Sequence, residues 1–65
     1  MRIYLTIKGK TVAASQTFNA EDRDKEIRKL ERNIDFRNVT ETRDDGKHVI
    51  YAGKNGEEHA AIHPM

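Results

Sequence analysis

Apolar and polar residues alternate along the first part of the chain, which predicts a β-hairpin over residues 2–16. Ile3, Leu5 and Ile7 are separated by Tyr4 and Thr6, the period-2 pattern of a strand with one buried face. The pattern is interrupted at Lys8-Gly9, and glycine accepts the positive φ that a tight hairpin turn requires.

A two-residue loop at Lys8-Gly9 would set the register of this hairpin. It places Leu5 opposite Val12 and Ile3 opposite Ala14, so that two apolar pairs share one face. The opposite face would then carry Arg2, Tyr4, Ala13 and Ser15.

The spacing changes to a helical one over residues 20–34. Ile27, Leu30 and Ile34 follow each other at i, i+3 and i+7, which predicts an amphipathic helix with one narrow apolar stripe. Asn19 is the expected N-cap, and the Asp22 carboxylate is placed to help complete the cap. Because the stripe is thin, we expect the helix to pack by one side against a sheet.

Two strong turn signals divide residues 38–63 into three strands. Asp45-Gly46 and Asn55-Gly56 are typical hairpin turns, and they separate expected strands at Val39–Arg43, Lys47–Ala52 and Glu58–His63. The chain then has the order ββαβββ within a single domain, residues 1–65. This order predicts an α+β fold of two layers, an antiparallel sheet with one helix on one face. The strand order within the sheet stays open.

A two-residue loop at Asn55-Gly56 would also assign side chains to the two faces of the last hairpin. It pairs His48 with His63 and Ile50 with Ala61. The more apolar set, expected on the helix side, is Val49, Tyr51, Ala60 and Ile62. The other set, expected to face solvent with all three histidines, is His48, Ile50, Ala52, His59, Ala61 and His63.

Size and composition exclude several classes of protein. A chain of 65 residues buries only about 60% of its unfolded surface, too little to enclose a deep active site. The formal net charge of +1 argues against an electrostatic nucleic-acid clamp, and the absence of cysteine excludes disulfides. No apolar run reaches the roughly 18 residues of a membrane span, and the alternating N-terminus is unlike a signal peptide. We therefore expect a cytoplasmic protein without membrane contact.

The histidines are the first candidates for chemistry, yet their spacing does not predict a metal site. On a strand, His59 and His63 would lie roughly 13 Å apart, too far to bind one ion. His48 and His63 would be closer, but two imidazoles without a third ligand form a weak site. We therefore predict neither metal nor cofactor.

Residues 25–64 resemble the HicA-type mRNA interferase toxins, small ribonucleases with a double-stranded-RNA-binding-like fold. The resemblance rests on the helix segment Lys25–Asn33, the strand Gly46–Tyr51 containing His48, and Ala61–Pro64. It implies that His48 is the catalytic histidine, acting as a general acid/base in RNA cleavage. Lys47 stands where the family has serine, and the hairpin over residues 2–16 has no counterpart in that fold.

RNA binding without cleavage is a related alternative. Tyr4 or Tyr51 could stack on a base, and residues 1–19 carry three basic and no acidic side chains. The basic residues outside the helix are Arg2, Lys8, Lys10, Arg37, Arg43, Lys47 and Lys54. Acidic residues in or beside the turns, such as Asp45 and Glu57, oppose the approach of a phosphate, so nucleic acid ranks below protein as a partner.

The composition and the half-covered sheet favour a non-enzymatic binding protein that acts through its open sheet face or an edge strand. The candidate binding residues are Arg2, Tyr4, Arg43, Lys47, His48, Ile50, His59 and His63. The expected partner is another protein, and a homodimer is also compatible with an exposed edge. Short, charge-rich, cysteine-free chains are common among phage and mobile-element proteins, and this analogy extends the hypothesis to an inhibitor of a host protein or defence complex.

Overall fold

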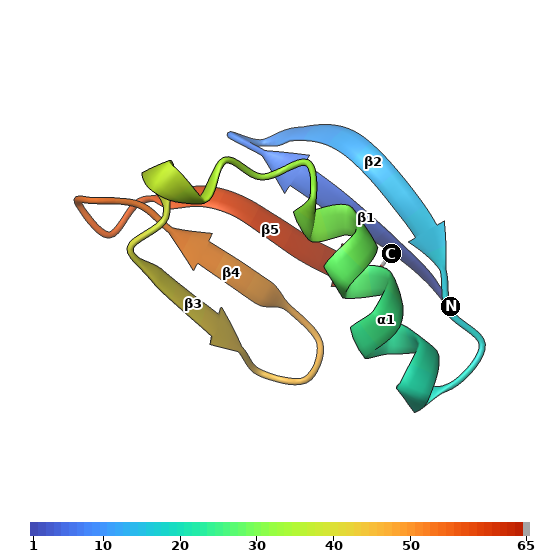
Figure 1. Ribbon diagram of the computed structural model, residues 1–65. Helices are drawn as coiled ribbons and strands as arrows, with labels where there is room; N and C mark the ends of the chain where they lie inside the picture. Colours follow the sequence, from blue (N-terminus) through green and yellow to red (C-terminus); the bar gives the residue numbers. More distant parts are fainter. Residues whose placement is uncertain (65) are drawn as a thin grey trace.

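The computed structural model describes residues 1–64 as one helix packed on one antiparallel sheet (Figure 1). The elements are β1 (Arg2–Ile7), β2 (Lys10–Gln16), α1 (Ala20–Glu31), the 3-10 helix η1 (Phe36–Asn38), β3 (Glu41–Asp44), β4 (Val49–Ala52) and β5 (Glu58–Pro64). The predicted ββαβββ order and the α+β class are therefore confirmed.

The strand order, which the sequence left open, is β2-β1-β5-β4-β3. The β1–β2 hairpin and the β3–β4–β5 meander are joined where β1 pairs antiparallel with β5. Strands β1 and β5 therefore lie inside the sheet. Helix α1 crosses one face of the sheet, and no helix of residues 1–64 lies on the opposite face (Figure 1). The sheet edges are β2 and β3.

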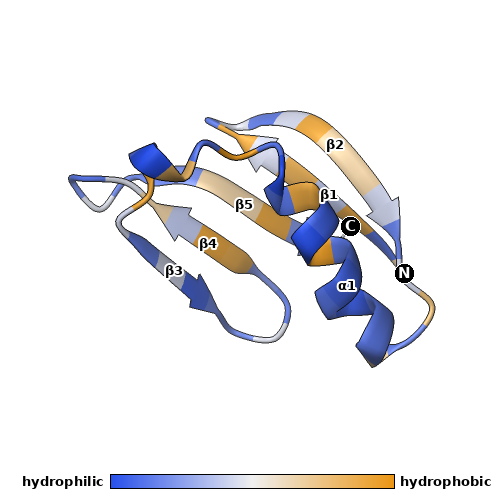
Figure 2. Ribbon diagram, in the orientation of Figure 1, coloured by the Kyte–Doolittle hydropathy of each residue, from blue (hydrophilic) through white to orange (hydrophobic). Residues whose placement is uncertain are grey.

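The core lies between α1 and the covered face of the sheet. Ile27 and Leu30 are buried on the helix, and Ile34 is buried just beyond its end. They pack with sheet residues from four strands: Ile3, Leu5, Ala13, Val49, Tyr51, Ala60 and Ile62. Figure 2 shows α1 as mainly hydrophilic with short hydrophobic stretches, as the narrow stripe in the sequence predicts.

Helix α1 begins as predicted and ends earlier. The Asn19 side chain accepts a hydrogen bond from the Asp22 backbone nitrogen at 3.0 Å, and the Asp22 carboxylate accepts one from Phe18 N at 3.2 Å. Both bonds satisfy donors at the start of the helix, which otherwise lack partners. The helix closes at Glu31 rather than residue 34, and a following turn brings Ile34 back into the core.

The first hairpin has the predicted turn but a different register. Lys8 and Gly9 have φ of +51° and +81°, and Ile7 pairs with Lys10, as in a two-residue turn. Beyond it, Leu5 pairs with Ala13 and Ile3 with Ser15, so the predicted pairs with Val12 and Ala14 are wrong.

The cause is a β-bulge, because Val12 is an extra residue between the pairs Thr6–Thr11 and Leu5–Ala13. The bulge turns Ala13 and Ser15 to the helix side, where the Ser15 hydroxyl donates to the Glu26 carboxylate. It leaves the Val12 side chain 51% exposed.

The last three strands form the predicted meander with longer loops. Asp44 pairs with Val49, so four residues, 45–48, connect β3 to β4 instead of the three between the expected strands. The Asp45 carboxylate closes this loop by accepting from the backbone nitrogens of Lys47 and His48 at 2.8 and 2.7 Å. The expected strands over Val39–Arg43 and Lys47–Ala52 are correspondingly shorter.

In the last hairpin, the pair Ile50–Ala61 is confirmed, as is the burial of Val49, Tyr51, Ala60 and Ile62. The loop is not the expected two-residue one, because Gly53 N donates to Glu57 O at 2.7 Å and encloses a longer turn. Tyr51 pairs with Ala60 and Ala52 with Glu58, so His59 is an unpaired bulge residue.

Candidate functional site

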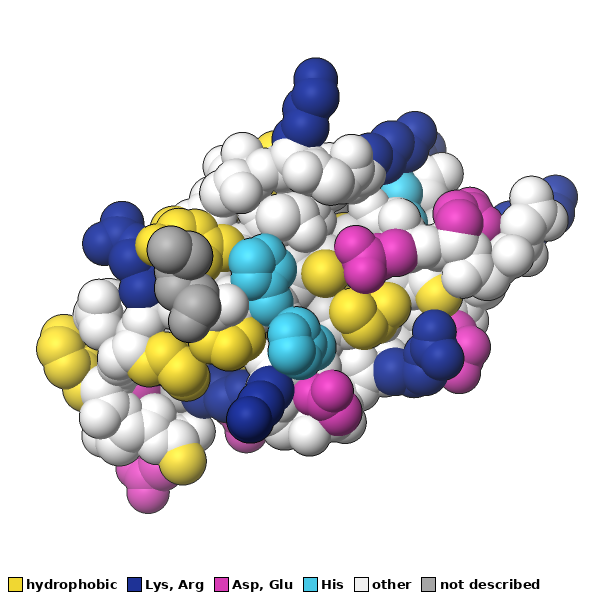
Figure 3. Space-filling view, turned by 180° about the vertical axis from the view of Figure 1, so that it is seen from behind, with side chains coloured by type: hydrophobic (Ala, Val, Ile, Leu, Met, Phe, Trp, Pro, Cys, Tyr) yellow, Lys and Arg dark blue, Asp and Glu magenta, His cyan; other side chains and the backbone are white. Residues whose placement is uncertain are grey.

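The uncovered face of the sheet brings together most of the predicted binding residues. Cross-strand pairs place Tyr4 beside His63, and a second row joins Thr6, Ala61, Ile50 and Arg43 from β1, β5, β4 and β3. We call this surface the open face. Figure 3 views it directly and shows hydrophobic side chains beside two histidines, with charged side chains around them.

Planar side chains form one row of the open face. The Arg2 guanidinium lies 6.0 Å from the centre of the Tyr4 ring, a cation–π distance. The Tyr4 and His63 rings are stacked, with centroids 6.1 Å apart and planes inclined by 28°. Both rings are half-buried, so they are ordered by their neighbours and still available to a partner.

His48 lies at the end of this row, in the loop before β4. Val49 pairs with Ile62, so the register brings His48 next to His63, and Figure 3 shows two imidazoles side by side. His48 Nδ1 is 3.7 Å from the Asp45 carboxylate. Backbone hydrogen bonds from His48 and Lys47 lower the pKa of Asp45, which keeps a negative charge beside the imidazole.

Ile50 is the apolar centre of the second row. It is half-buried between Ala61 on β5 and Arg43 on the edge strand β3. Ala61 itself is only 5% exposed, although it lies on the uncovered face. Neighbouring side chains therefore already shield the middle of this face from water.

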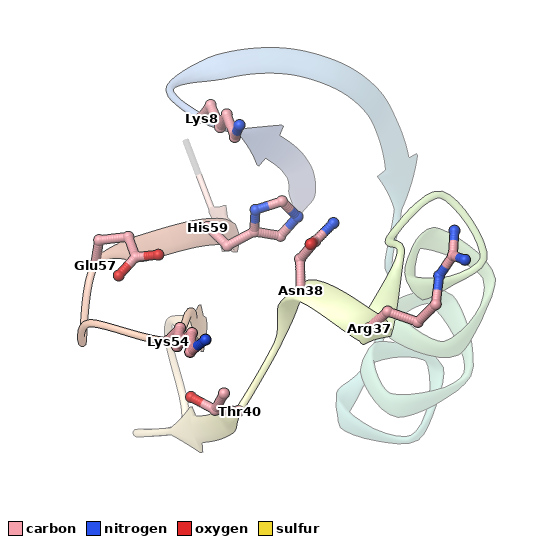
Figure 4. A pocket seen from close by; sticks show the side chains of 7 residues that line it. All are labelled: Lys8, Arg37, Asn38, Thr40, Lys54, Glu57 and His59. Carbon is pink, nitrogen blue, oxygen red and sulfur yellow. The ribbon is translucent and has the colours of Figure 1, made fainter.

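The third histidine is separated from the other two. His59 lies at the end of the sheet, in an open pocket of about 490 Å³ between the β1–β2 turn, η1 and the β4–β5 turn (Figure 4). The other lining residues are Lys8, Arg37, Asn38, Thr40, Lys54 and Glu57. The expected three-histidine surface is thus a pair on the open face and a single imidazole in the pocket.

The pocket as a unit has no signal in the sequence. Its lining residues come from segments that are distant along the chain. The local sequence around each of them predicts only a turn or surface residue. Only the pairing of β1 with β5 brings Lys8 to His59, whose carbonyl accepts from Lys8 N at 2.9 Å.

Phe18 is a second feature that the hydrophobic pattern did not single out. It precedes the N-cap of α1, and 84% of it is exposed. Its backbone nitrogen bonds to Asp22, so the capping interaction holds the aromatic ring outside the core.

The two sheet edges differ in their protection against strand addition. Edge strand β3 has four residues, of which Glu41, Arg43 and Asp44 are charged. Edge strand β2 has seven residues and carries no charge from Thr11 to Gln16, with a bulge at Val12 as its one irregularity. Charges are a common means of blocking strand addition, so β2 is the more receptive edge.

Residues 1–64 contain no group of three or more His, Cys, Asp or Glu side chains placed to hold a metal ion. No helix in this range is long and apolar enough to cross a membrane.

Comparison with known proteins finds no matching family model, no matching curated protein and no matching solved structure. Any function assigned to the chain therefore rests on its own geometry and charge.

Proposed function

We propose that the protein is a non-enzymatic binding module that docks the open face of its sheet against a protein partner. The observation that carries this proposal is the composition of that face, an apolar and aromatic centre formed by Tyr4, Ala61 and Ile50 with arginines at its sides. Tyr and Arg are enriched at binding hot spots, and a desolvated centre within a polar rim is typical of protein interfaces.

The charges of the open face favour protein over nucleic acid. Arg2 and Arg43 are matched in number by Glu41 and Glu58, which both pair with Ala52 and so lie on the same side of the sheet. Binding to nucleic acid draws most of its affinity from excess positive charge against phosphates. A face with balanced charges lacks this contribution, whereas it suits a partner with mixed polar groups.

Docking of this kind would inhibit a host enzyme or defence complex if it covered a functional surface. Phage and mobile-element proteins commonly act in this way. Covering a functional surface of the partner with the open face would inhibit that partner without any catalytic step. The partner's own activity, assayed with and without the protein, tests this finer proposal.

The experiment for docking compares protein capture by the wild type, Ile50→Glu and Lys25→Glu. Ile50 is central on the open face, and Lys25 is an exposed residue of α1 on the opposite layer. We expect Ile50→Glu to weaken binding of the captured partner by about tenfold or more. Lys25→Glu should bind as the wild type does, and circular dichroism should show both variants folded. Equal affinity of the wild type and Ile50→Glu would remove the open face as the docking surface.

Strand addition at β2 is a second way to bind a protein, including a further copy of the chain. The uncharged edge from Thr11 to Gln16 favours it. Sedimentation equilibrium should then show a concentration-dependent mass that Ala14→Lys abolishes, and a strictly monomeric wild type would exclude homodimers.

RNA cleavage remains a second candidate function, favoured by the placement of His48. Its imidazole is exposed, lies 3.7 Å from the Asp45 carboxylate and adjoins His63, so two proton-transfer groups are close together. Cleavage of single-stranded RNA that disappears in His48→Ala and persists in His59→Ala would support this function. Intact RNA after incubation with the wild type would exclude it.

A further inference from the structure

We infer that the pocket at the end of the sheet binds a small organic phosphate, a phosphate monoester whose organic part carries hydroxyl groups. This site lies apart from the open face, so it is independent of the docking function proposed above. It is built from Lys8 of the β1–β2 turn, Asn38 of η1 and the segment from Lys54 to His59 that leads into β5.

The pocket walls are fastened to one another by backbone hydrogen bonds. Lys8 N donates to His59 O at 2.9 Å, which joins the first turn to β5. Thr40 N donates to Ala52 O at 2.8 Å, and the Thr40 hydroxyl donates to Gly53 O at 3.0 Å, which joins the segment after η1 to the last turn. A site held in this way needs little ordering when a ligand binds, which lowers the entropic cost of binding.

Basic residues outnumber acidic ones in the pocket lining, with Lys8, Arg37 and Lys54 against Glu57. Within residues 1–64, neither Lys8 nor Lys54 takes part in a salt bridge, so both ammonium groups are free for a ligand. Arg37 differs, because it makes a two-point bond to Asp35 at 3.0 and 2.8 Å and points away from His59 (Figure 4). The anion site therefore consists of two lysines and the His59 imidazole, a set suited to a phosphate group.

Lys8 occupies a backbone position that turn chemistry does not favour for lysine. Its φ of +51° belongs to the left-handed region, where only a few per cent of non-glycine residues are found. Asn, Asp and Gly are preferred at this first position of a two-residue hairpin turn. A lysine there brings a cation to the pocket at a small cost in turn stability.

The remaining lining residues indicate the organic part of the ligand. Asn38, Thr40 and Glu57 provide an amide, a hydroxyl and a carboxylate, which hydrogen-bond to hydroxyl groups. No Phe, Tyr or Trp is among the described residues that line the pocket, so a nucleobase would find only the His59 ring to stack on. The volume of about 490 Å³ lies within the roughly 300–1,000 Å³ of small-molecule sites.

The Glu57 carboxylate lets the pocket discriminate between a sugar phosphate and inorganic phosphate. Its carboxylate is held by the Asn55 backbone nitrogen at 2.8 Å and lies so close to Gly53 that a Cβ there would collide with it. A fixed carboxylate accepts hydrogen bonds from hydroxyl groups, which the organic part of a sugar phosphate offers and inorganic phosphate lacks. The pocket should therefore prefer a sugar phosphate to inorganic phosphate.

Amide chemical shifts of the ¹⁵N-labelled protein, titrated with ribose 5-phosphate, test this inference. We expect saturable shifts at Lys8, Gly9 and residues 54–59, weaker effects of inorganic phosphate and none of ribose. Equal effects of ribose 5-phosphate and inorganic phosphate would reduce the site to an ion site and overturn the organic part of the inference. No saturable shift with ribose 5-phosphate up to about 10 mM would overturn it entirely.

Variants separate binding from folding. Lys8→Asn places a preferred turn residue at this position, so the variant should keep or raise the melting temperature. Its affinity for ribose 5-phosphate should fall about tenfold, because one cation of the site is lost. Lys10→Gln, two residues away and outside the pocket lining, is the matched control and should bind as the wild type does. Glu57→Gln should strengthen the binding of inorganic phosphate and reduce the preference for ribose 5-phosphate over it. Unchanged affinity in Lys8→Asn would contradict the assigned anion site.

Discussion

Tyr51 shows how one residue links the two layers of the molecule. Its side chain is fully buried on β4, and its hydroxyl donates to the Glu31 carboxylate at the end of α1 at 2.6 Å. Phe36 packs edge-on against the ring, with centroids 5.8 Å apart. Burial, together with the hydrogen bond to Glu31, raises the pKa of Tyr51 far above its usual range, so the phenol stays a donor.

Removing this hydroxyl should destabilise the protein without creating a large cavity. We expect Tyr51→Phe to lower the free energy of unfolding by about 1–2 kcal/mol, because the bond to a charged acceptor is lost. Urea denaturation followed by circular dichroism measures the change. Tyr4→Phe is the matched control, since the Tyr4 hydroxyl makes no hydrogen bond within residues 1–64, and an equal loss in both variants would contradict this role.

Individual residues also show how far the sequence predicts which side chains lie on the open face. Arg2, Tyr4, Ile50 and His63 lie on the face to which alternation assigned them, and Arg43 joins them through its pair with Ile50. Lys47 and His48 are at its border in the β3–β4 loop, and His59 lies elsewhere because a bulge interrupts the alternation before Ala60.

At the scale of the elements, the bulge in β2 decides which side chains of this strand face the helix. The alternating pattern predicted Val12 and Ala14 on the Leu5 side, and the extra residue exchanges them for Ala13 and Ser15. A shift of one residue moves every later side chain to the other face, because the side-chain period of a strand is two. Nothing in the local sequence marks the bulge, since its benefit is the contact between Ser15 and Glu26 on α1.

Substitutions in β2 distinguish the two registers directly. Val12→Ala should change the free energy of unfolding by less than about 0.5 kcal/mol, because the side chain is exposed. Ala13→Asp should cost more than about 1 kcal/mol, because it places a carboxylate against the core. Thermal melts of the two variants give the comparison, and the reverse ranking would restore the register without a bulge.

At the scale of the whole molecule, the helix is tied to the far side of the sheet by one exposed ion pair. The Arg23 guanidinium donates to both oxygens of Asp44 at 3.1 and 2.9 Å, joining α1 to the end of edge strand β3. The hydrogen bond from Arg23, with a further one from Gly46 N, lowers the pKa of Asp44 below its usual value.

This pair should make stability depend on acid pH. Because the pKa of Asp44 is lower in the folded state, the stabilisation is complete above the unfolded value near 4 and is lost as the pH falls through the folded value. Arg23→Gln should lower the melting temperature by about 2–6 °C at pH 7. The difference from the wild type should shrink below about pH 4, as measured by thermal melts across the pH range, and a constant difference would contradict the assignment.

Local pattern was sufficient for the element types, the helix cap, the helix-side residues of the last hairpin and the placement of Arg2, Tyr4, Ile50 and His63 on one face, because hydrophobic period and turn chemistry act over a few neighbouring positions. The strand order, both bulges and the phosphate pocket depend on contacts between distant segments. Pairing of β1 with β5 creates the pocket by bringing Lys8 to His59, and Ser15 meets Glu26 only once α1 lies across the sheet. Such contacts form only after the chain has closed on itself, so no local window of the sequence contains them.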